Sequence, residues 1–500
     1  MTERRSPVLP ALAGAGLLAV AALAWWFTGR NADTMPDSTA AATAQRRPVP
    51  VIFYLIDTLR ADRLGLYGYD KPTSPIIDAL AKESVVFDRA HSAAPWTLPS
   101  VSSLFTSRFP CEHGVIRNQL RLSESLPTLA ERLQAAGYAT GSYYQNNFVG
   151  PMAGLSRGFQ VVEFRQDLET LDLDAREFLG RVADQPYFLY LHSMEPHATY
   201  FAPRDLVKKF GYVSIDDHEA FRAHWIGYRM MWFADAKASR PVGSTDTTEG
   251  VDLAINNINA LEASAHILYD AAVNFADIEL GQTIEVLRQT GAWDEAIFVL
   301  LADHGEEMRD HGLWFHDQSV YEEMTHVPLM IHFPGGRHGG KRVSENVSLL
   351  DVMPTVLDFV GEGDACENCR GSSLLPLVDA AYGGTYRPSE LPTMRWNVWG
   401  YYKPLKASRG DINVVVRDGD LKGIWNKEPG TVELYDLASD PGEQQDLGPS
   451  DGTRATAMAD KAAQWLAQCE ATKVAPTEVA PEDISSEDRD RLRAHGYFGG

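Results

Sequence analysis

The stretch Val51-Ile52-Phe53-Tyr54-Leu55-Ile56-Asp57 is an uninterrupted apolar run that ends in a carboxylate. Such a run is typical of a strand that is buried on both faces of a sheet. Residues 297–302 repeat the pattern and are followed by Asp303-His304, and two further runs lie at residues 187–191 and 327–331. We therefore predict four buried strands, two of which lead into an aspartate.

Helical patterns separate these runs, for example at residues 74–83, 126–136 and 263–290. Strands that alternate with helices predict an α/β fold, in which a large and mostly parallel sheet is covered by helices on both sides. In such sheets, ligands bind at the carboxyl ends of the strands. Asp57 and Asp303 are therefore expected to meet at one edge of the sheet.

Composition and charge exclude several classes of protein. The chain has 500 residues, of which 44% are hydrophobic and 23% are charged, so it is not disordered, collagen-like or a small disulfide scaffold. Its 45 basic and 68 acidic residues give a net charge of −23. Binding to nucleic acid through its phosphates needs a clustered basic surface. Nucleic acid is therefore not an expected partner, whereas an anionic substrate held by a metal is compatible with this charge; the oligomeric state stays open.

Residues 1–27 predict a membrane anchor. Arg4 and Arg5 precede an apolar run at residues 8–27, which is about 30 Å long as a helix and matches the core of a bilayer. Trp25 and Trp26 stand at its distal end, where an aromatic belt meets the headgroups. A cleaved signal peptide is the alternative. The positive-inside rule predicts a single-pass protein of the cytoplasmic (inner) membrane, with the catalytic domain exported to the periplasm.

The rest of the chain divides into a linker, a large domain and a smaller C-terminal part. Residues 28–49 have the composition of a flexible linker. The catalytic domain is expected at residues 50–386. Within it, residues 206–261 combine an aromatic cluster with a polar run, which indicates either a surface insertion with its own small core or a lid that shapes substrate choice.

Residues 387–500 show a different pattern. A short apolar run at residues 414–416 precedes the turn Asp418-Gly419-Asp420. Short strands joined by tight turns predict an antiparallel sheet, so we expect a small α+β subdomain that closes on a C-terminal helix. The acidic run at residues 478–490 indicates a solvated tail segment.

Three short segments carry residues suited to metal-assisted chemistry. Asp57, Asp303 and His304 supply two hard oxygens and one imidazole, a set that suits a divalent ion such as Mn²⁺, Zn²⁺ or Mg²⁺, with Ca²⁺ as a further possibility. Thr97 precedes Pro99 in the first turn of a helix expected at residues 98–106. The positive end of a helix stabilises an anion, and a metal lowers the pKa of a hydroxyl and orients it for attack. Thr97 is therefore both a fourth candidate ligand and a candidate nucleophile.

These segments, in this order, resemble the sulfatase family of the alkaline-phosphatase superfamily over nearly all of the chain after Val49. The resemblance implies an alkaline-phosphatase-like fold, with one large α/β domain, a C-terminal subdomain and a metal-assisted ester hydrolase site. The motifs that carry it are Asp57-Thr58-Leu59-Arg60-Ala61-Asp62, Tyr67-Gly68-Tyr69, Thr73-Ser74-Pro75, Pro110-Cys111-Glu112-His113-Gly114-Val115, Gly158-Phe159, Glu195-Pro196-His197, Asp303-His304-Gly305-Glu306, His311-Gly312, Tyr321-Glu322-Glu323, Val327-Pro328-Leu329, Asp351-Val352-Met353-Pro354-Thr355, Gly371-Ser372-Ser373-Leu374-Leu375-Pro376 and Glu433-Leu434-Tyr435-Asp436-Leu437.

Departures from the family pattern decide the expected chemistry. The family signature is Cys or Ser, any residue, Pro, any residue and Arg, and its first residue is oxidised to formylglycine. Here the same frame is Thr97-Leu98-Pro99-Ser100-Val101. Oxidation of a threonine would give a ketone, because its Cβ carries a methyl branch, so no formylglycine is expected. The chain thereby resembles the Thr-nucleophile branch, with its phosphodiesterases, phosphonate monoester hydrolases and phosphoglycerol transferases.

The resemblance assigns roles to individual residues. Thr97 is the expected nucleophile, and Asp57, Thr97, Asp303 and His304 are the expected ligands of one divalent metal ion. His197 and His316 are expected to contact the substrate oxyanion or the leaving group, with His311 as an alternative to His316. Arg60 is given no more than a role in organising the strand end, and His113 and His192 are taken as structural. Cys366 and Cys369 are expected to form a local disulfide, because exported proteins favour disulfides, whereas Cys111 and Cys469 are expected to be buried or unpaired.

The leading hypothesis is a membrane-anchored, metal-dependent hydrolase or transferase that acts on phosphate esters. Three alternatives stay open: a sulfuric ester hydrolase, a two-zinc nucleotide pyrophosphatase or phosphodiesterase, and a non-catalytic binding homologue. The two-zinc alternative needs a further Asp and two His whose usual spacing the segment Glu195-Pro196-His197 does not supply. The non-catalytic alternative is disfavoured because Asp57, Asp303 and His304 are all present.

Overall fold

The buried run Val51–Ile56 forms strand β1 at the centre of an eight-stranded sheet, whose strand order is β11-β2-β10-β7-β1-β6-β4-β5. The computed structural model describes residues 48–165, 170–182, 185–214, 261–366, 368–387, 392–396 and 412–479. Strand β1 pairs in parallel with β6 and β7, and β10 is antiparallel to both of its neighbours. The other strands of the sheet are β2 (Val85–His91), β4 (Ala139–Tyr144), β5 (Val161–Phe164), β6 (Tyr187–Ser193), β7 (Ile297–Leu301), β10 (His326–His332) and β11 (Arg342–Ser348).

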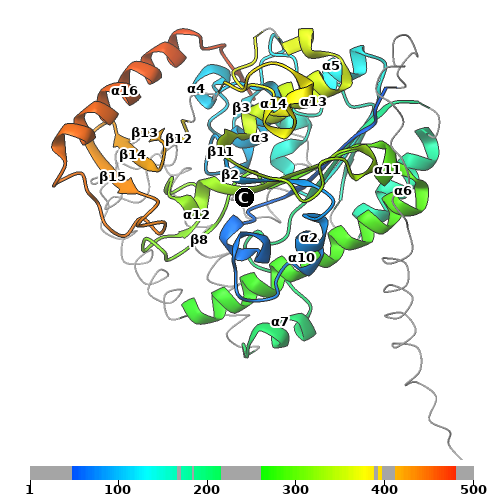
Figure 1. The fold of residues 1–500 in the computed structure, drawn as a ribbon, viewed down its shortest axis with the longest axis horizontal. Coiled ribbons are helices and arrows are strands. Elements are labelled where there is room, and N and C mark those ends of the chain that lie inside the picture. Colours follow the sequence, from blue (N-terminus) through cyan, green and yellow to red (C-terminus); the bar gives the residue numbers. More distant parts are fainter. Residues whose placement is uncertain are drawn as a thin grey trace, which may run out of the picture. The chain divides into compact units, whose positions relative to one another are not determined.

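Helices cover both faces of this sheet, as expected for an α/β fold (Figure 1). Helices α2 and α10 lie on one face, and α3, α5, α13 and α14 lie on the other. All six residues of β1 are buried, because both faces of the strand are covered. The helices are α2 (Pro75–Leu80), α3 (Thr97–Thr106), α4 (Pro110–His113), α5 (Leu129–Ala135), α6 (Leu171–Val182), α7 (Arg204–Phe210), α10 (Glu262–Thr290), α11 (Ala292–Glu295), α12 (Glu322–Thr325), α13 (Val352–Val360), α14 (Leu375–Val378) and α16 (Gly452–Ala471).

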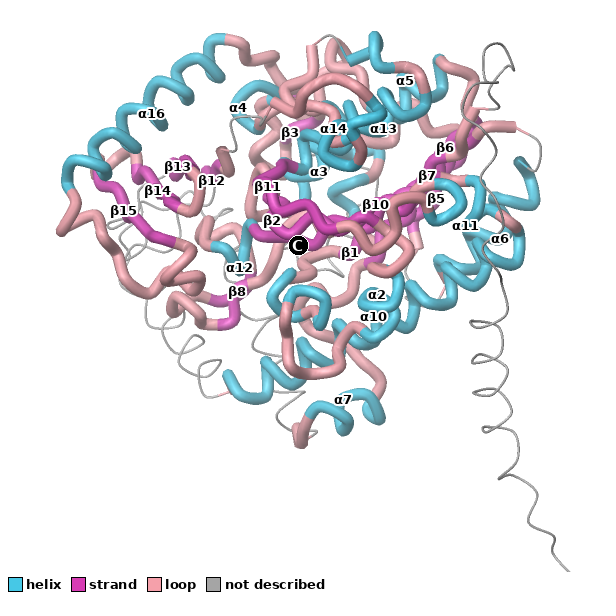
Figure 2. Tube along the Cα trace, in the orientation of Figure 1, coloured by secondary structure: helices cyan, strands magenta, loops and turns pink. Residues whose placement is uncertain are grey.

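The C-terminal subdomain is built on a second, four-stranded antiparallel sheet, seen beside α16 in Figure 2. Its strands are β12 (Met394–Trp396), β13 (Ile412–Asp418), β14 (Leu421–Asn426) and β15 (Thr431–Asp436). The apolar run at 414–416 lies in β13, and the tight turn expected at 418–420 joins β13 to β14. These strands are antiparallel, as expected, and α16 follows them in the chain. Two short pairs complete the strands: β3 (Leu120–Arg121) with β16 (Thr477–Glu478), and β8 (Glu307–Met308) with β9 (Trp314–Phe315).

The four predicted strands and the helices expected at 74–83, 126–136, 263–290 and 98–106 are all present, with small shifts at their ends. Other predictions fall on residues that the structure does not describe. These are the anchor at 1–27, most of the linker, the aromatic cluster of Trp225, Tyr228, Trp232 and Phe233, and the tail beyond residue 479. Among the helices that are described, none combines the length and the apolar character that a membrane span requires.

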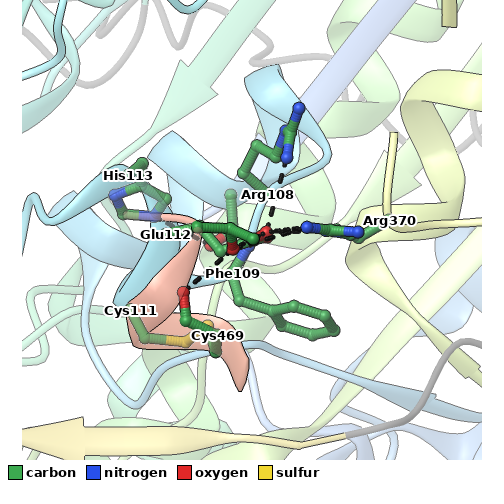
Figure 3. The surroundings of a disulfide bond; sticks show 9 residues. Arg108, Phe109, Cys111, Glu112, His113, Arg370 and Cys469 are labelled. Atoms are coloured by element: carbon green, nitrogen blue, oxygen red, sulfur yellow. Dashed lines mark hydrogen bonds and ion pairs between the residues drawn. A yellow bond between two sulfur atoms is a disulfide. The ribbon is translucent and has the colours of Figure 1, made fainter. Parts of the chain in front are cut away.

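The four cysteines form two disulfides, one expected and one not. Cys366 pairs with Cys369, as predicted. Cys111 and Cys469 are buried, as expected, but they are not unpaired: a disulfide joins Cys111 in α4 to Cys469 in α16. Figure 3 shows that Glu112 lies next to this bond, where its carboxylate accepts a hydrogen bond of 2.6 Å from Nε of Arg370. The C-terminal helix is thus attached covalently to the helix that follows α3.

Candidate active site

The predicted site forms where four neighbouring parallel strands end. In the order β7-β1-β6-β4, the carboxyl ends of these strands lie beside one another. Asp303 follows β7, Asp57 follows β1, His192 lies near the end of β6 and Asn146 follows β4. Helix α3 adds Thr97, its first residue. The side chain of Ser100 ties α3 to the end of β7, because its Oγ donates a hydrogen bond of 2.7 Å to the carbonyl of Asp303.

His304 lies among the three oxygen-bearing residues that were predicted to share a metal with it. Its Nε2 is 3.3 Å from Oγ1 of Thr97, 3.7 Å from Oδ1 of Asp57 and 3.5 Å from Oδ2 of Asp303. Its Nδ1 is 2.8 Å from the carbonyl oxygen of Gly305, so Nδ1 carries the proton and Nε2 presents a lone pair. Gly305 is required here, because a Cβ on it would lie 1.8 Å from the carbonyl oxygen of Glu323.

This donor set fits one divalent ion. Among the described residues, Oδ1 of Asp57 and Oδ2 of Asp303 are buried and accept no hydrogen bond, which is costly unless a cation meets them. Two ligands that bind one ion at 2.0–2.2 Å are about 3.4 Å apart in tetrahedral geometry and about 3.0 Å apart when adjacent in octahedral geometry. The separations around Nε2 of His304, 3.3–3.7 Å, are close to the tetrahedral value and slightly above the octahedral one. The structure therefore brings together the four residues predicted to be ligands.

The electrostatics of the two aspartates point to the same conclusion. Burial raises the pKa of Asp57, but the hydrogen bond from His192 and the charge of His197 outweigh burial and lower this pKa to about 2. Burial and the charge of Asp57 raise the pKa of Asp303 to about 6. Two buried carboxylates in one place resist being charged together, and a bound cation removes that conflict.

Two residues of the site were not predicted to belong to it. Nε2 of His192 is 3.1 Å from Oδ2 of Asp57, and Oη of Tyr190 is 2.7 Å from its Nδ1. His192 groups with Asp57 and Asp303, but both of its ring nitrogens face hydrogen-bond partners, so it supports Asp57. Nδ2 of Asn146 donates to Oδ2 of Asp57 at 2.6 Å and to Oγ1 of Thr97 at 3.3 Å.

A sequence signal exists for both residues, but it is weak. His192 directly follows the strand predicted at residues 187–191, and that strand lies beside β1, so its place at the site edge follows once the strand order is known. Asn146 follows β4, whose sequence Ala-Thr-Gly-Ser-Tyr-Tyr lacks the apolar run that marks a buried strand. The sequence therefore did not predict that Asn146 lies at the end of a buried strand.

The two histidines predicted to contact the substrate lie near His304. The rings of His304 and His316 have centroids 4.9 Å apart, and those of His316 and His197 are also 4.9 Å apart. Nδ1 of His316 is 3.1 Å from Oε1 of the buried Glu306, which orients the ring. Nδ1 of His197 is 2.7 Å from the carbonyl oxygen of Ala198.

His311, the alternative to His316, lies elsewhere. Its Nδ1 is 2.5 Å from Oε1 of Glu323, and its Nε2 is 3.1 Å from the carbonyl oxygen of Glu443. Its ring also stacks on Tyr321, with centroids 3.5 Å apart. With Glu307 and Glu323 it forms a second group of possible metal ligands, but both of its ring nitrogens already face hydrogen-bond partners.

Arg60 organises the strand end, as the sequence analysis expects. Its guanidinium is buried and donates to both carboxylate oxygens of Asp62 and to both of Asp310, at 2.7–3.0 Å. A further bond of 3.0 Å reaches the carbonyl of Glu306, next to the carboxylate that holds His316. Arg60 thus joins the segment after β1 to the loop that carries His316.

Comparison with known proteins is consistent with this geometry. Residues 50–362 match the profile of the Sulfatase family, and residues 309–469 match the profile described as N-sulphoglucosamine sulphohydrolase, C-terminal. Arylsulfatase K of Bos taurus is 30% identical over 470 residues, which cover 84% of this chain and 83% of that protein. Choline-sulfatase of Rhizobium meliloti is 25% identical over 468 residues, which cover 83% of this chain and 86% of that protein.

The fold has relatives among solved structures as well. The crystal structure of phosphonate monoester hydrolase of Agrobacterium radiobacter matches with a TM-score of 0.61 and 18% identity, covering 87% of this chain and 100% of that chain. At this identity the likeness shows the fold alone. The family profile spans more than half of the sequence, and the site residues Asp57, Thr97, Asp303 and His304 all lie within it. The chain belongs to the sulfatase family, whose members are ester hydrolases that bind a divalent metal.

Proposed function

We propose that the chain is a metal-dependent hydrolase of phosphate diesters or phosphonate esters, with unmodified Thr97 as its nucleophile. The observation that carries the proposal is the position of Oγ1 of Thr97, 3.3 Å from Nε2 of His304, in the first turn of α3. The hydroxyl oxygen lies beside the two aspartates and at the positive end of a helix. The helix end favours a developing negative charge on that oxygen, and a cation bound by the two carboxylates would favour it as well.

Asp57, Thr97, Asp303 and His304 would hold the ion, with His192 and Asn146 supporting Asp57. A bound divalent cation would stabilise the negative charge on the oxygens of the transferred group and lower the pKa of the threonine hydroxyl. These ligands are oxygen donors with one imidazole, a combination that suits Mn²⁺, Zn²⁺ or Mg²⁺.

The chain's own residues account for the two halves of the reaction. Oγ of Thr97 attacks phosphorus, the bond from phosphorus to the leaving oxygen breaks, and the leaving alkoxide takes a proton from His316 or His197. The hydroxyl proton of Thr97 passes to water, and the histidine that protonated the alkoxide is left neutral, so it can take a proton from the water that attacks in the second half. Water then attacks the phosphorus of the phosphothreonine, the bond to Oγ breaks, and Thr97 regains a proton. Glu306 keeps His316 oriented in both halves, through Nδ1.

The choice of phosphorus over sulfur follows from the nucleophile. A formylglycine sulfatase releases sulfate by collapse of a hemiacetal, which breaks a carbon–oxygen bond. Unmodified threonine has no such route, so its intermediate is released by attack on the transferred group itself. In a phosphate diester one negative charge is shared by two non-bridging oxygens, whereas in a sulfate monoester it is shared by three, so each phosphoryl oxygen gains more from a divalent cation. A phosphothreonine is therefore better matched to this site than a threonine sulfate.

Sulfate ester hydrolysis is the competing function, because the curated relatives include an arylsulfatase and a choline-sulfatase. Steady-state kinetics on the purified Mn²⁺-loaded protein would separate the two. We expect a higher kcat/KM on an aryl phosphodiester or aryl phosphonate than on the matched aryl sulfate, with Thr97 unmodified by mass spectrometry. Thr97→Ala is expected to lower the faster activity by about 10³-fold or more. A higher kcat/KM on the sulfate would overturn the proposal.

We also propose that the catalytic domain acts outside the cytoplasm, tethered by residues 1–27. Two disulfides support an oxidising compartment, and the apolar run at residues 8–27 supports a membrane anchor. Full-length protein is expected in the membrane fraction after alkaline extraction. Recovery of a soluble form that starts after residue 27 would show that the segment is cleaved.

A further inference from the structure

The side chain of Asn146 joins the proposed nucleophile, Thr97, to a predicted metal ligand, Asp57. It lies just beyond β4, it is 1% exposed, and its Nδ2 reaches both Asp57 and Thr97. Neither the motifs of the sequence nor the ligand set of the proposed function uses it. Its contacts are made by a neutral amide, so its role does not depend on a change of charge.

The orientation of this amide is fixed by the chain itself. The backbone N–H of Phe148 donates a hydrogen bond of 2.9 Å to Oδ1 of Asn146. Oδ1 is therefore the acceptor and Nδ2 the donor, which settles the choice between the two ends of the amide. Nδ2 has two hydrogens, and they have two acceptors: Oδ2 of Asp57 at 2.6 Å and Oγ1 of Thr97 at 3.3 Å.

The direction of the hydrogen bonds at Thr97 then follows. His304 carries its proton on Nδ1, which faces the carbonyl of Gly305, so its Nε2 is an acceptor. Oγ1 of Thr97 consequently receives a hydrogen bond from Asn146, while Nε2 of His304 keeps the lone pair that would bind the ion. When Thr97 loses its hydroxyl proton, the oxygen keeps the N–H donor of Asn146. A preorganised donor on a developing oxyanion is among the stronger contributions that an active site makes.

The other hydrogen of Nδ2 acts on Asp57. Oδ2 of Asp57 is occupied by Asn146 and His192, at 2.6 and 3.1 Å. Its other oxygen, Oδ1, is the one that faces His304, at 3.7 Å. One amide thus selects which carboxylate oxygen is presented to the predicted ion and supports the nucleophile at the same time.

We infer that Asn146 is a catalytic residue, which donates a hydrogen bond to the oxygen of Thr97 and stabilises it as an alkoxide during attack. This inference rests on the proposed function, since it assigns a partner to the proposed nucleophile. A role confined to holding Asp57 would change metal affinity and leave turnover of the metal-loaded enzyme intact. A role at Thr97 lowers kcat even when the metal is saturating.

The test uses three variants of the full chain. Asn146→Ala removes the donor. Asn146→Asp keeps the shape and the acceptor for Phe148 but places no N–H toward Thr97. Asn147→Ala is the matched control, because Asn147 is the adjacent buried asparagine and its Nδ2 makes no hydrogen bond among the described residues. For each, Mn²⁺ affinity is measured by titration calorimetry and Tm by scanning calorimetry. kcat and KM are measured on the aryl phosphodiester at saturating Mn²⁺.

We expect kcat to fall by about 10²-fold in both Asn146 variants, with KM and Tm close to those of the wild type and Asn147→Ala within threefold of it. The Mn²⁺ Kd of Asn146→Ala is expected to rise by about 10-fold. The inference is overturned if kcat of either Asn146 variant stays within threefold at saturating Mn²⁺, or if Asn147→Ala loses as much. Failure of the proposed function is a separate result: wild-type turnover retained by Thr97→Ala would show that threonine is not the nucleophile.

Discussion

Two of the acidic clusters in the described part of the chain balance their negative charge in different ways. In the site cluster, Asp57 and Asp303 are both completely buried, and among the described residues they form ion pairs with histidines alone. In the interface cluster, defined as Glu322, Glu443, Arg417 and Lys422, buried cations stand between the carboxylates. Nζ of Lys422 is 2.8 Å from both Glu322 and Glu443, and Nη2 of Arg417 is 2.7 Å from Glu322.

The difference separates a structural role from a functional one. Lys422 and Arg417 come from β14 and β13 of the subdomain, and Glu322 begins α12 of the large domain. The interface cluster carries its own counter-charges, so it holds two parts of the protein together. The site cluster leaves Oδ1 of Asp57 and Oδ2 of Asp303 without hydrogen bonds. Such an arrangement is costly unless an external cation completes it.

The largest effect is expected from opening the site cluster. Asp303→Ala should lower activity by about 10³-fold or more, because a predicted ligand and half of the cluster's charge are lost. It should also abolish tight Mn²⁺ binding, while the fold survives because the residue lies at a strand end. Calorimetric Mn²⁺ titration and kinetics check this, with the exposed Asp294→Ala in α11 as control. Full activity after chelation and dialysis of the wild type would remove the metal from the mechanism.

The interface cluster should respond in the opposite way. Lys422→Met leaves Glu443 buried without its cation, and breaking a buried pair costs about 3–5 kcal/mol of unfolding free energy. Mn²⁺ affinity should remain, because Lys422 pairs with Glu322 and Glu443 and not with the predicted metal ligands. Urea denaturation at pH 8 measures the loss, with the exposed Lys427→Met as control. Loss of metal binding with unchanged stability would refute the division of roles.

The same contrast explains what could be predicted from the sequence. The site aspartates follow continuous apolar runs, so their strands, and their meeting at the sheet edge, were predictable from local pattern. Asn146 follows a strand with no such pattern, and the pairing of Glu322 with Lys422 spans 100 residues. The disulfide from Cys111 to Cys469 closes a separation of 358 residues. Contacts of this kind depend on how distant elements pack, and no local periodicity encodes that packing.

The disulfides provide a comparison of their own. Cys111–Cys469 attaches α16 to α4 across 358 residues, whereas Cys366–Cys369 spans three. Because a cross-link stabilises more when it closes a longer loop, removing the first with Cys111→Ser and Cys469→Ser should cost about 2–5 kcal/mol. Removing the second should cost about 1–2 kcal/mol. Chemical denaturation of both double variants checks the order, and equal losses would contradict it.

The smallest effect is a pH dependence that arises in the interface cluster. Burial raises the pKa of Glu443 to about 7. The charge of Lys422 lowers this pKa, and the charge of Glu322 raises it. Below the ordinary pKa of a glutamate, the carboxyl is protonated in both the folded and the unfolded chain. As pH rises toward 7, the unfolded chain releases this proton and the folded chain keeps it, so the contribution of Glu443 to stability is lost over that range.

The expected loss between pH 5 and pH 8 is at most about 3 kcal/mol, since one pKa unit corresponds to about 1.4 kcal/mol. Glu443→Gln should flatten this part of the stability profile, because glutamine does not titrate and so cannot release a proton on unfolding. Urea denaturation across this pH range measures the slope, with Glu470→Gln on the exposed face of α16 as control. A profile of Glu443→Gln that runs parallel to that of the wild type would show that Glu443 is ionised in the folded protein. In that case both carboxylates of the interface cluster carry charge, shared between Lys422 and Arg417.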